Sequence, residues 1–224
     1  MPLTVKICGV TTHEALAAAL DAGADMIGFV FFPKSPRHLS LAQAGEVSRR
    51  VEGRAQTVAL LVNPEDGQID AVVRAMRPDL LQLHGAETPD RVADIRKTFG
   101  VPILKAFGVA DSDDLARAET YRGVADRLLL DAKPPKNGLL PGGNGLAFDW
   151  TLVRDFSPGA PWMLSGGLTP DNVGDAVRLT GTPGVDVSSG VEDGPGQKSL
   201  AKIRAFVAAA RLAQDQLGLA TGSV

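Results

Sequence analysis

Short apolar segments alternate with amphipathic segments along almost the whole chain, with a repeat of about 25 residues. Each apolar segment has the length of a buried strand and ends at polar or turn-forming residues. These segments predict eight strands, over Thr4–Cys8, Met26–Val30, Gln56–Val62, Leu80–Leu83, Pro102–Ala106, Arg127–Leu130, Pro161–Leu164 and Val185–Val187.

The segments between these strands carry apolar residues at helical spacing. They predict helices over Thr12–Ala22, Leu41–Val51, Asp66–Met76, Pro89–Thr98, Ser112–Thr120, Pro170–Thr180 and Ser199–Gln216. Thr11 or Thr12 is a suitable N-cap for the first helix. After the sixth strand, a long loop leaves only the weak helical segment Asp149–Asp155.

The repeated βα units run without a change in composition and without a linker. They predict an α/β fold of the (β/α)8 TIM-barrel type, as a single domain over residues 1–224. The last residues, from about 217 to 224, are expected to form a frayed tail. An open, doubly wound sheet is the alternative, because periodicity does not show whether a sheet closes.

Composition narrows the class of protein further. The chain has 224 residues, 44% of them hydrophobic, and a net charge of −3, which argues against nucleic-acid and anionic-membrane partners. Its single cysteine fits a reducing compartment. We see no signal-peptide pattern and no apolar run of the roughly 18 residues that a membrane span needs. We therefore expect a cytoplasmic protein.

Chemistry-bearing residues gather where the predicted strands end. Cys8 ends the first strand, and Lys6, two residues before it, projects to the same side. Gln82 and His84 share a face of the fourth strand in the same way. Asp131 follows a strongly apolar strand, where it either does chemistry or accepts backbone N–H bonds. We expect the Cys8 thiol to be exposed at the strand mouth, although a free cysteine is usually a small buried hydrophobe.

Two glycine-containing loops follow the last two strands. Gly166 and Gly167 separate the seventh strand from a helix, and Ser188, Ser189 and Gly190 follow the eighth. Glycine lets backbone N–H groups approach an anion closely, and a helix N-terminus adds a favourable dipole. In barrels of this type these two loops often form a phosphate site. The sequence therefore predicts a phosphate-bearing ligand here.

Taken together, these motifs closely resemble the phosphoribosylanthranilate isomerase family, from Lys6 to about residue 207. The matching segments are residues 6–9, 28–31, 35–37, 82–85, 129–131, 142–145, 148–150, 164–167 and 186–192. Two departures are small: Asn144 stands where the family often has Thr or Ser, and the loop over 133–141 looks long. Both affect the loop after the sixth strand.

The resemblance implies an Amadori rearrangement of N-(5'-phosphoribosyl)anthranilate in tryptophan biosynthesis, with no cofactor. Asp131 matches the general acid of the family and Cys8 its general base. Arg37, which by residue type alone is a solvated surface charge, matches the partner of the anthranilate carboxylate. Lys6 either favours the Cys8 thiolate or is neutralised by Asp186, and the sequence leaves both arrangements open.

The other expected ligand contacts complete this picture. Lys6, Gln82 and His84 are expected to contact the substrate, with the phosphate held by the two late loops and Arg37 on the other side of the barrel mouth. The loop Pro135–Ala147 is expected to act as a lid. We expect no metal site, because the three histidines lie on separate segments.

Rival interpretations remain at this stage. Indole-glycerol-phosphate synthase and ribulose-phosphate epimerase share the phosphate loops, but the former is expected to use lysine and glutamate and the latter metal ligands. A histidine-pathway aminoaldose as a second substrate, or a non-catalytic phosphate-binding barrel, are further alternatives. The expected partner is a phosphorylated aminosugar, and the chain is expected to be a monomer or a weak homodimer.

Overall fold

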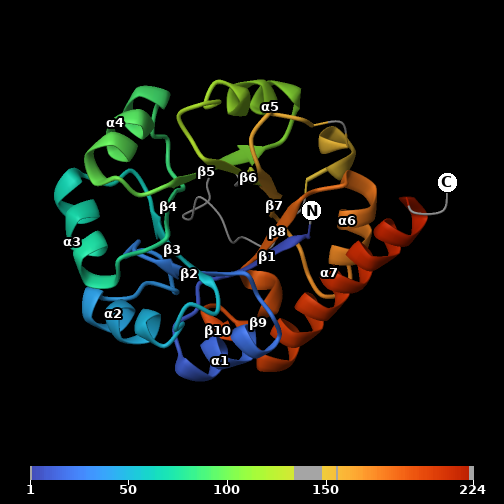
Figure 1. The fold of residues 1–224 in the computed structure, drawn as a ribbon, viewed down its shortest axis with the longest axis horizontal. Helices are drawn as coiled ribbons and strands as arrows, with labels where there is room; N and C mark the ends of the chain where they lie inside the picture. The colour runs from blue at the N-terminus through green and yellow to red at the C-terminus, as the bar shows by residue number, and fades with distance from the viewer. Residues whose placement is uncertain (1, 134–147, 155, 222–224) are drawn as a thin grey trace.

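Eight parallel strands close into a barrel in the computed structural model, which describes residues 2–133, 148–154 and 156–221. Strand β1 pairs with β2 on one side and with β8 on the other, so the open-sheet alternative is wrong and the barrel prediction is confirmed (Figure 1). The strands are β1 (Thr4–Cys8), β2 (Met26–Val30), β3 (Gln56–Leu61), β4 (Leu80–Leu83), β5 (Ile103–Val109), β6 (Arg127–Ala132), β7 (Trp162–Leu164) and β8 (Gly184–Val187).

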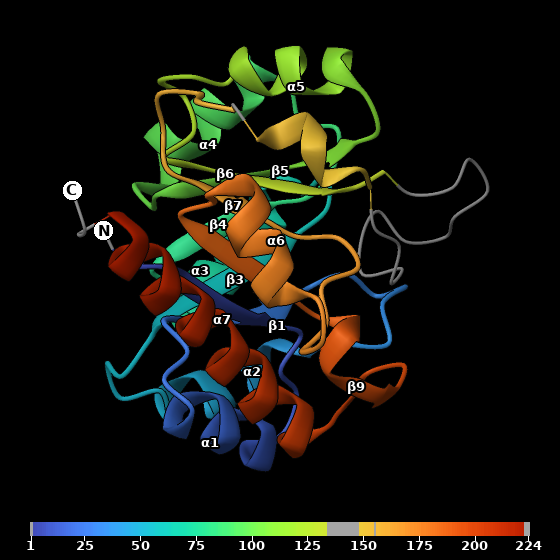
Figure 2. The ribbon, with the colours of Figure 1, turned by 90° about the vertical axis from the view of Figure 1, so that its right-hand side faces the viewer.

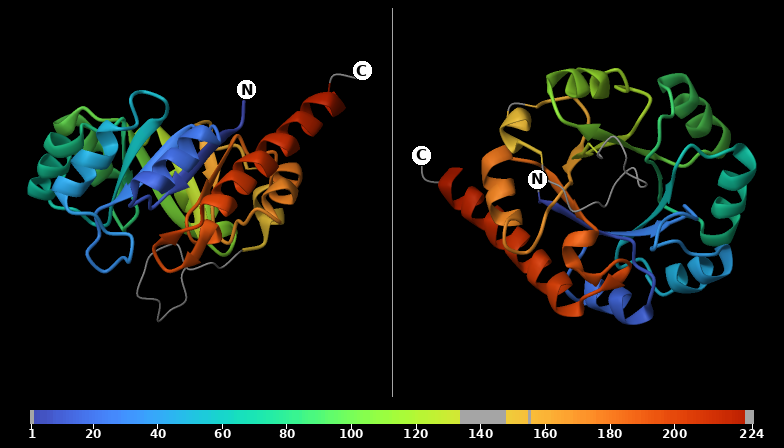
Figure 3. Two further views of the ribbon diagram at one scale, coloured as in Figure 1. Left: turned by 90° about the horizontal axis from the view of Figure 1, so that it is seen from below. Right: turned by 180° about the vertical axis from the view of Figure 1, so that it is seen from behind.

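The helices surround the strands (Figure 1). The described helices are α1 (His13–Asp21), α2 (Leu41–Arg49), α3 (Asp66–Met76), α4 (Pro89–Phe99), α5 (Ser112–Glu119), α6 (Val173–Thr180) and α7 (Leu200–Thr221). In the weak segment predicted over 149–155, the described residues 149–154 form a 3₁₀ helix, η1 (Trp150–Val153), in place of an α-helix. Helix α7 packs against α1 and α6 and runs on to Thr221, five residues past its predicted end at Gln216, and Figure 3 shows it projecting beyond the barrel.

Local side-chain caps start several of these helices. The Thr12 hydroxyl accepts a hydrogen bond from the backbone N–H of Ala15, which confirms Thr12 as the cap of α1. Ser40 and Gln43 form a capping box at the start of α2. Each such cap stabilises the fold by about 1 kcal/mol, because it satisfies backbone donors that the helix leaves unpaired.

The side chains of the sheet alternate between two cores. Met26, Val58, Leu80, Leu104, Ala106, Leu129 and Met163 form one buried cluster contributed by six strands, as expected for the barrel interior. The large second core contains buried side chains of both strands and helices and lies between them. A smaller interior cluster of Cys8, Val30 and Leu60 lies near the carboxyl ends of the first three strands. The candidate chemistry therefore begins where the apolar filling of the barrel ends.

Three aspartates close the opposite, N-terminal end of the barrel. Each one immediately precedes an even-numbered strand and accepts, through its carboxylate, a backbone N–H from the preceding strand. The bonds are Val5 N to Asp25 Oδ2 at 2.6 Å, Thr57 N to Asp79 Oδ2 at 2.7 Å and Ile103 N to Asp126 Oδ2 at 2.8 Å. This end of a barrel usually serves stability, and these repeated bonds satisfy strand donors that would otherwise be unpaired.

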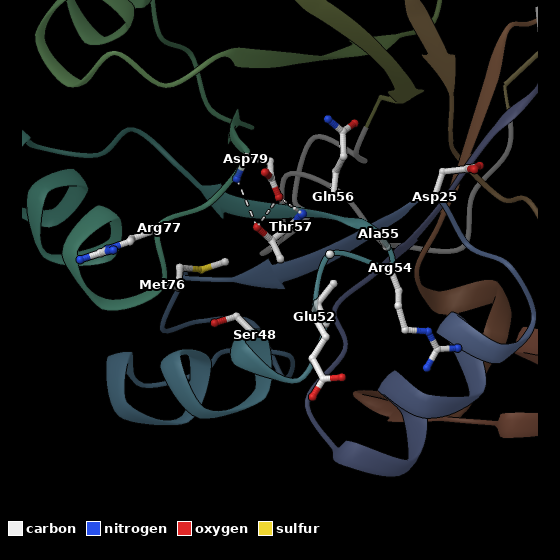
Figure 4. A pocket seen from close by; sticks show the side chains of 12 residues that line it. Asp25, Ser48, Glu52, Arg54, Ala55, Gln56, Thr57, Met76, Arg77 and Asp79 are labelled. Atoms are coloured by element: carbon white, nitrogen blue, oxygen red, sulfur yellow. Dashed lines mark hydrogen bonds between the residues drawn. The ribbon is translucent and has the colours of Figure 1, made fainter.

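A pocket of about 570 Å³ opens at this N-terminal end, between α2 and α3 (Figure 4). Three of its charged residues have structural partners: Asp25 accepts the Val5 N–H, Asp79 is bonded to Thr57, and Arg54 to Asp21. In Figure 4 the side chain of Arg77 points away from the others. The pocket lies at the end of the barrel away from the predicted catalytic residues, and Asp25 and Asp79 in its lining are two of the aspartates that bond the barrel strands.

Replacing Asp79 with alanine is expected to lower the free energy of unfolding by about 1–3 kcal/mol, because it leaves the Thr57 N–H without its acceptor. Chemical denaturation measures this loss. Asp79→Asn keeps an acceptor oxygen and is the matched control, with a smaller expected loss. Equal stability of the alanine variant and the unsubstituted protein would refute the capping role.

Candidate active site

The Cys8 thiol lies inside the barrel at the end of β1. Only 4% of the residue is exposed, and it packs with Val30 and Leu60, so the expectation of an exposed thiol is wrong. Gly28 pairs with Cys8 across β1 and β2, and a Cβ added at Gly28 would lie 2.9 Å from the Cys8 Sγ. The sulfur therefore fits inside the barrel because the neighbouring strand has no side chain there.

A buried ion pair lies one pleat below the thiol. Lys6 and Asp186 face each other in the β1–β8 register, with 2.8 Å between Nζ and Oδ1. The Ser165 hydroxyl lies 3.3 Å from the other carboxylate oxygen. Burial lowers the pKa of Lys6, but the attraction and hydrogen bonding of Asp186 and Cys8 together outweigh it, so the pKa is raised. The structure therefore has the Lys6–Asp186 pair considered from the sequence, and it also keeps the other arrangement, because the Lys6 charge lowers the pKa of Cys8.

The protein environment of Cys8 favours its neutral thiol. Burial raises its pKa, and this outweighs the opposing effect of the Lys6 and Lys198 charges, which favour the thiolate. The negative charge of Asp186 raises the pKa further. Proton abstraction by Cys8 therefore depends on how strongly the two lysines counteract its burial.

The rate of Cys8 alkylation by iodoacetamide is expected to rise with pH along a curve whose midpoint lies above that of an unperturbed thiol. The sign follows from the raised pKa, because only the thiolate reacts and burial holds the proton to higher pH. The rate is measured across a pH series, with a cysteine-containing peptide of matched sequence as the control. A midpoint below that of the peptide would contradict this account.

The second group of predicted site residues comes together between β4 and β6. Gln82 Nε2 lies 2.9 Å from His84 Nδ1, and His84 Nε2 lies 3.4 Å from Asp131 Oδ2. Asp131 is buried within β6, one residue before its end, and not just beyond it as predicted. Its Oδ1 accepts the backbone N–H of Ala132, so it has the structural contact considered at the sequence level. The same carboxylate nevertheless turns its other oxygen towards His84.

A buried lysine fixes the loop that carries His84. Lys105 Nζ donates to the carbonyls of Leu83 and Gly85 at 3.1 and 2.8 Å, and lies 3.0 Å from Glu87 Oε2. Glu87 in turn accepts the backbone N–H of Gly85. Burial lowers the pKa of Lys105 despite this carboxylate. The buried ion pair of Lys105 and Glu87 therefore fixes the backbone of the β4–α4 loop through hydrogen bonds. The sequence analysis did not identify this pair.

Arg37 is buried, which corrects the view of it as a solvated surface charge. Its Nε and Nη2 donate to the two carboxylate oxygens of Glu192, both at 2.8 Å. This bidentate pair occupies one edge of the guanidinium, and the Nη1 edge is geometrically separate. Arg37 also lies beside the predicted phosphate loop: a Cβ at Gly9 would meet Arg37 Cδ at 2.5 Å and Ser188 Oγ at 3.2 Å. The expected placement of Arg37 opposite that loop is therefore wrong.

The two glycine-containing loops contact each other. Gly166 and Gly167 both have positive φ, +84° and +65°. A Cβ at Gly190 would lie 1.8 Å from the carbonyl oxygen of Leu168, so only glycine allows this approach. The short 3₁₀ helix η2 (Ser189–Val191) starts directly after Ser188, whose hydroxyl donates to the Cys8 carbonyl at 3.1 Å. The predicted phosphate loops thus meet beside Cys8.

The comparison with known families decides the identity of this arrangement. The family described as N-(5'phosphoribosyl)anthranilate (PRA) isomerase matches residues 5–209. The chain belongs to this family.

Individual relatives agree with this assignment. The N-(5'-phosphoribosyl)anthranilate isomerase of Rhodopseudomonas palustris (strain BisA53) is 56% identical over 211 residues, 94% of this chain and 97% of that protein. The crystal structure of phosphoribosyl anthranilate isomerase from Thermotoga maritima is similar with a TM-score of 0.84 and 36% identity, over 93% of this chain and 98% of that one. A solved complex of such an isomerase with reduced 1-(o-carboxyphenylamino)-1-deoxyribulose 5-phosphate is similar with a TM-score of 0.81 and 35% identity, over the same shares.

The family assignment confirms the resemblance drawn from the motifs. The chain is an isomerase of tryptophan biosynthesis with the barrel fold of the phosphoribosylanthranilate isomerase family. The non-catalytic barrel and the other phosphosugar families considered above are thereby set aside.

The predicted lid over 135–147 lies outside the described residues, so its role stays a prediction. Within the described part of the chain, no His, Cys, Asp and Glu residues form a group of three or more that could hold a metal ion. No helix in the same part of this isomerase has both the length and the apolar character of a membrane span.

Besides the Lys105–Glu87 pair, sequence reasoning missed three contributors to the site. Gly28 makes room for the thiol, and its signal was a glycine inside an apolar strand, which often marks a close approach. Glu192 stood in a quoted motif without a role, and Lys198 was not considered. Both lie on a short antiparallel hairpin of β9 (Glu192–Gly194) and β10 (Gln197–Lys198), at the end of the barrel away from the N-terminus (Figure 2).

Proposed function

We propose that the enzyme converts N-(5'-phosphoribosyl)anthranilate into 1-(2-carboxyphenylamino)-1-deoxyribulose 5-phosphate, with Asp131 as general acid and Cys8 as general base. One observation carries the proposal: a buried thiol and a buried carboxylate lie at the carboxyl ends of β1 and β6, beside glycine loops suited to phosphate. The relatives named for this substrate, and the solved complex with a reduced product, support it.

The chemistry divides into two proton transfers. Asp131 donates a proton to the ring oxygen while the C1'–O bond breaks, and the nitrogen lone pair forms the C1'=N bond of a protonated Schiff base. The Cys8 thiolate then removes the C2' proton, and the electron pair of that bond forms the enolamine. Tautomerisation moves a proton from the C2' hydroxyl to C1' and gives the ketone. At the end Asp131 has lost one proton and Cys8 has gained one. Proton exchange with solvent returns both to their starting protonation states.

The polar residues around the two groups orient the substrate. Gln82 Oε1 is buried and has no hydrogen-bond partner among the described residues, so it offers an acceptor for a substrate hydroxyl or amine. His84 orients the Asp131 carboxyl, and the Nη1 edge of Arg37 receives the anthranilate carboxylate. Backbone groups of Gly166, Gly167, Ser189 and Gly190 hold the phosphate, with Ser188 shaping their loop.

The remaining assignments are also ours. We place the enzyme in the cytoplasm, where reducing conditions keep its free cysteine, Cys8, unoxidised. Its partner is the phosphorylated small molecule. The expected monomer or weak homodimer is checked by measuring the molar mass in solution over a concentration series.

Loss of the fluorescence of phosphoribosylanthranilate, generated in situ because it is labile, tests the function. The purified enzyme is expected to accelerate this loss, and inorganic phosphate is expected to slow the catalysed rate by competing for the glycine loops. Loss at the uncatalysed rate would refute the proposed substrate. Catalysis that phosphate does not inhibit would refute the proposed phosphate site.

A further inference from the structure

Three buried charged side chains form a cluster behind Cys8: Arg37, Glu192 and Lys198. Glu192 Oε1 accepts hydrogen bonds from Arg37 Nε at 2.8 Å and from Lys198 Nζ at 2.7 Å. The side chains of the three are 7%, 4% and 1% exposed. One carboxylate therefore pairs with two basic side chains, next to the proposed phosphate loop.

Lys198 links this cluster to the main chain of the catalytic base. Its Nζ donates to the Ser188 carbonyl at 2.9 Å and lies 3.3 Å from the Ser188 hydroxyl, which itself donates to the Cys8 carbonyl at 3.1 Å. Together with Glu192, these contacts account for the three donors of the ammonium group. A single side chain thus contacts both the residue that holds Arg37 and the residue that begins the phosphate loop.

The backbone around Lys198 fixes its position. The β9–β10 hairpin pairs Lys198 directly with Glu192. At its turn, Gly196 has φ of +78°, and an added Cβ would lie 2.6 Å from the carbonyl oxygen of Pro36, the residue before Arg37. Buried ion pairs add little net stability, because desolvation offsets their attraction. The hairpin therefore holds a buried charge, whose desolvation is unfavourable, between Arg37 and the proposed phosphate loop.

We propose that Lys198 is a positioning residue, which holds Arg37 through Glu192 and the phosphate loop through Ser188 as one unit beside Cys8. This inference rests on the proposed function. It predicts that the two anion sites respond together when Lys198 changes, although neither anion is expected to touch it. The electrostatic effect of Lys198 on the thiol, which favours the thiolate, agrees with this placement.

The test compares Lys198→Met with the matched control Lys202→Met in the full-length, ligand-free enzyme. Lys202 Nζ also contacts the hairpin, at the Glu192 carbonyl at 2.7 Å and at Asp193, but its side chain is 45% exposed. Two measurements need no turnover: the pH profile of Cys8 alkylation, and the protection of Cys8 from alkylation by inorganic phosphate. The kcat and KM for the proposed substrate are measured in parallel.

Lys198→Met is expected to shift the alkylation midpoint to higher pH, to weaken phosphate protection, to raise KM and to lower kcat by on the order of 10²-fold, because small displacements at a reacting centre are costly. Lys202→Met is expected to change none of these. An unchanged alkylation profile and unchanged phosphate protection in a folded Lys198→Met enzyme would overturn the proposal. Failure of the proposed substrate would instead appear as no turnover in the unsubstituted enzyme, with both thiol measurements still informative.

Lys198→Arg keeps a cation beside Glu192. It tests the positioning role if the methionine variant does not fold. A planar guanidinium cannot reproduce the three donor directions of the ammonium group. The alkylation midpoint is therefore expected to stay near that of the unsubstituted enzyme, while phosphate protection weakens. Full phosphate protection in Lys198→Arg would refute the positioning role and leave only an effect of charge.

Discussion

Replacing Cys8 with alanine is expected to lower kcat by about 10²–10⁴-fold, the usual contribution of a general base. The fold is expected to persist, because the change removes one sulfur from a small cluster with Val30 and Leu60. The kcat is measured with substrate generated in situ, and circular dichroism checks the fold. Retention of more than about a tenth of the rate would exclude Cys8 as the base.

Cys8→Ser separates the loss of the base from the loss of packing. Serine is close in size to cysteine, but its hydroxyl does not ionise near neutral pH, so a similar fall in kcat is expected. Phosphate inhibition is expected to remain in both variants, because the glycine loops provide it. Restoration of the rate by serine would show that the side chain acts through its shape alone.

Much of the fold could be predicted because its signals are local. The apolar segments located the eight barrel strands to within a few residues, but not the short strands β9 and β10, and the side chain of Thr12 capped α1 as its position suggested. The weak helix after β6 was harder, because a 3₁₀ turn such as Trp150–Val153 has too few residues to show periodicity. Closure of the barrel depends on pairing between β1 and β8, which no local pattern encodes.

The positions of the candidate site residues were easier to predict than their contacts. The sequence placed Cys8, Asp131 and the glycine loops at or near strand ends, and the structure has them there. The pair of Lys6 and Asp186, which lie 180 residues apart along the chain, was only one of two alternatives that the sequence left open. The partner of Arg37 was not found, because Glu192 is 155 residues away along the chain. For the same reason the burial of Cys8 was missed, since it depends on a glycine in the neighbouring strand.

Asp131→Asn is expected to lower kcat by about 10²–10⁴-fold, because an amide cannot supply the proton that opens the ring. The side-chain oxygen of asparagine still accepts the Ala132 N–H, so the end of β6 keeps its shape. Binding of a reduced product analogue is therefore expected to change little. Equal losses in binding and in rate would show that Asp131 mainly organises its loop.

Deuterium at C2' of the substrate distinguishes the acid from the base. In Cys8→Ala, removal of the C2' proton limits the rate, so deuterium is expected to slow turnover. In Asp131→Asn, ring opening comes first and becomes limiting, so the isotope effect is expected to disappear. A full isotope effect in Asp131→Asn would mean that the carboxyl assists the C2' proton transfer itself, and the two roles would then have to be reassigned between Cys8 and Asp131.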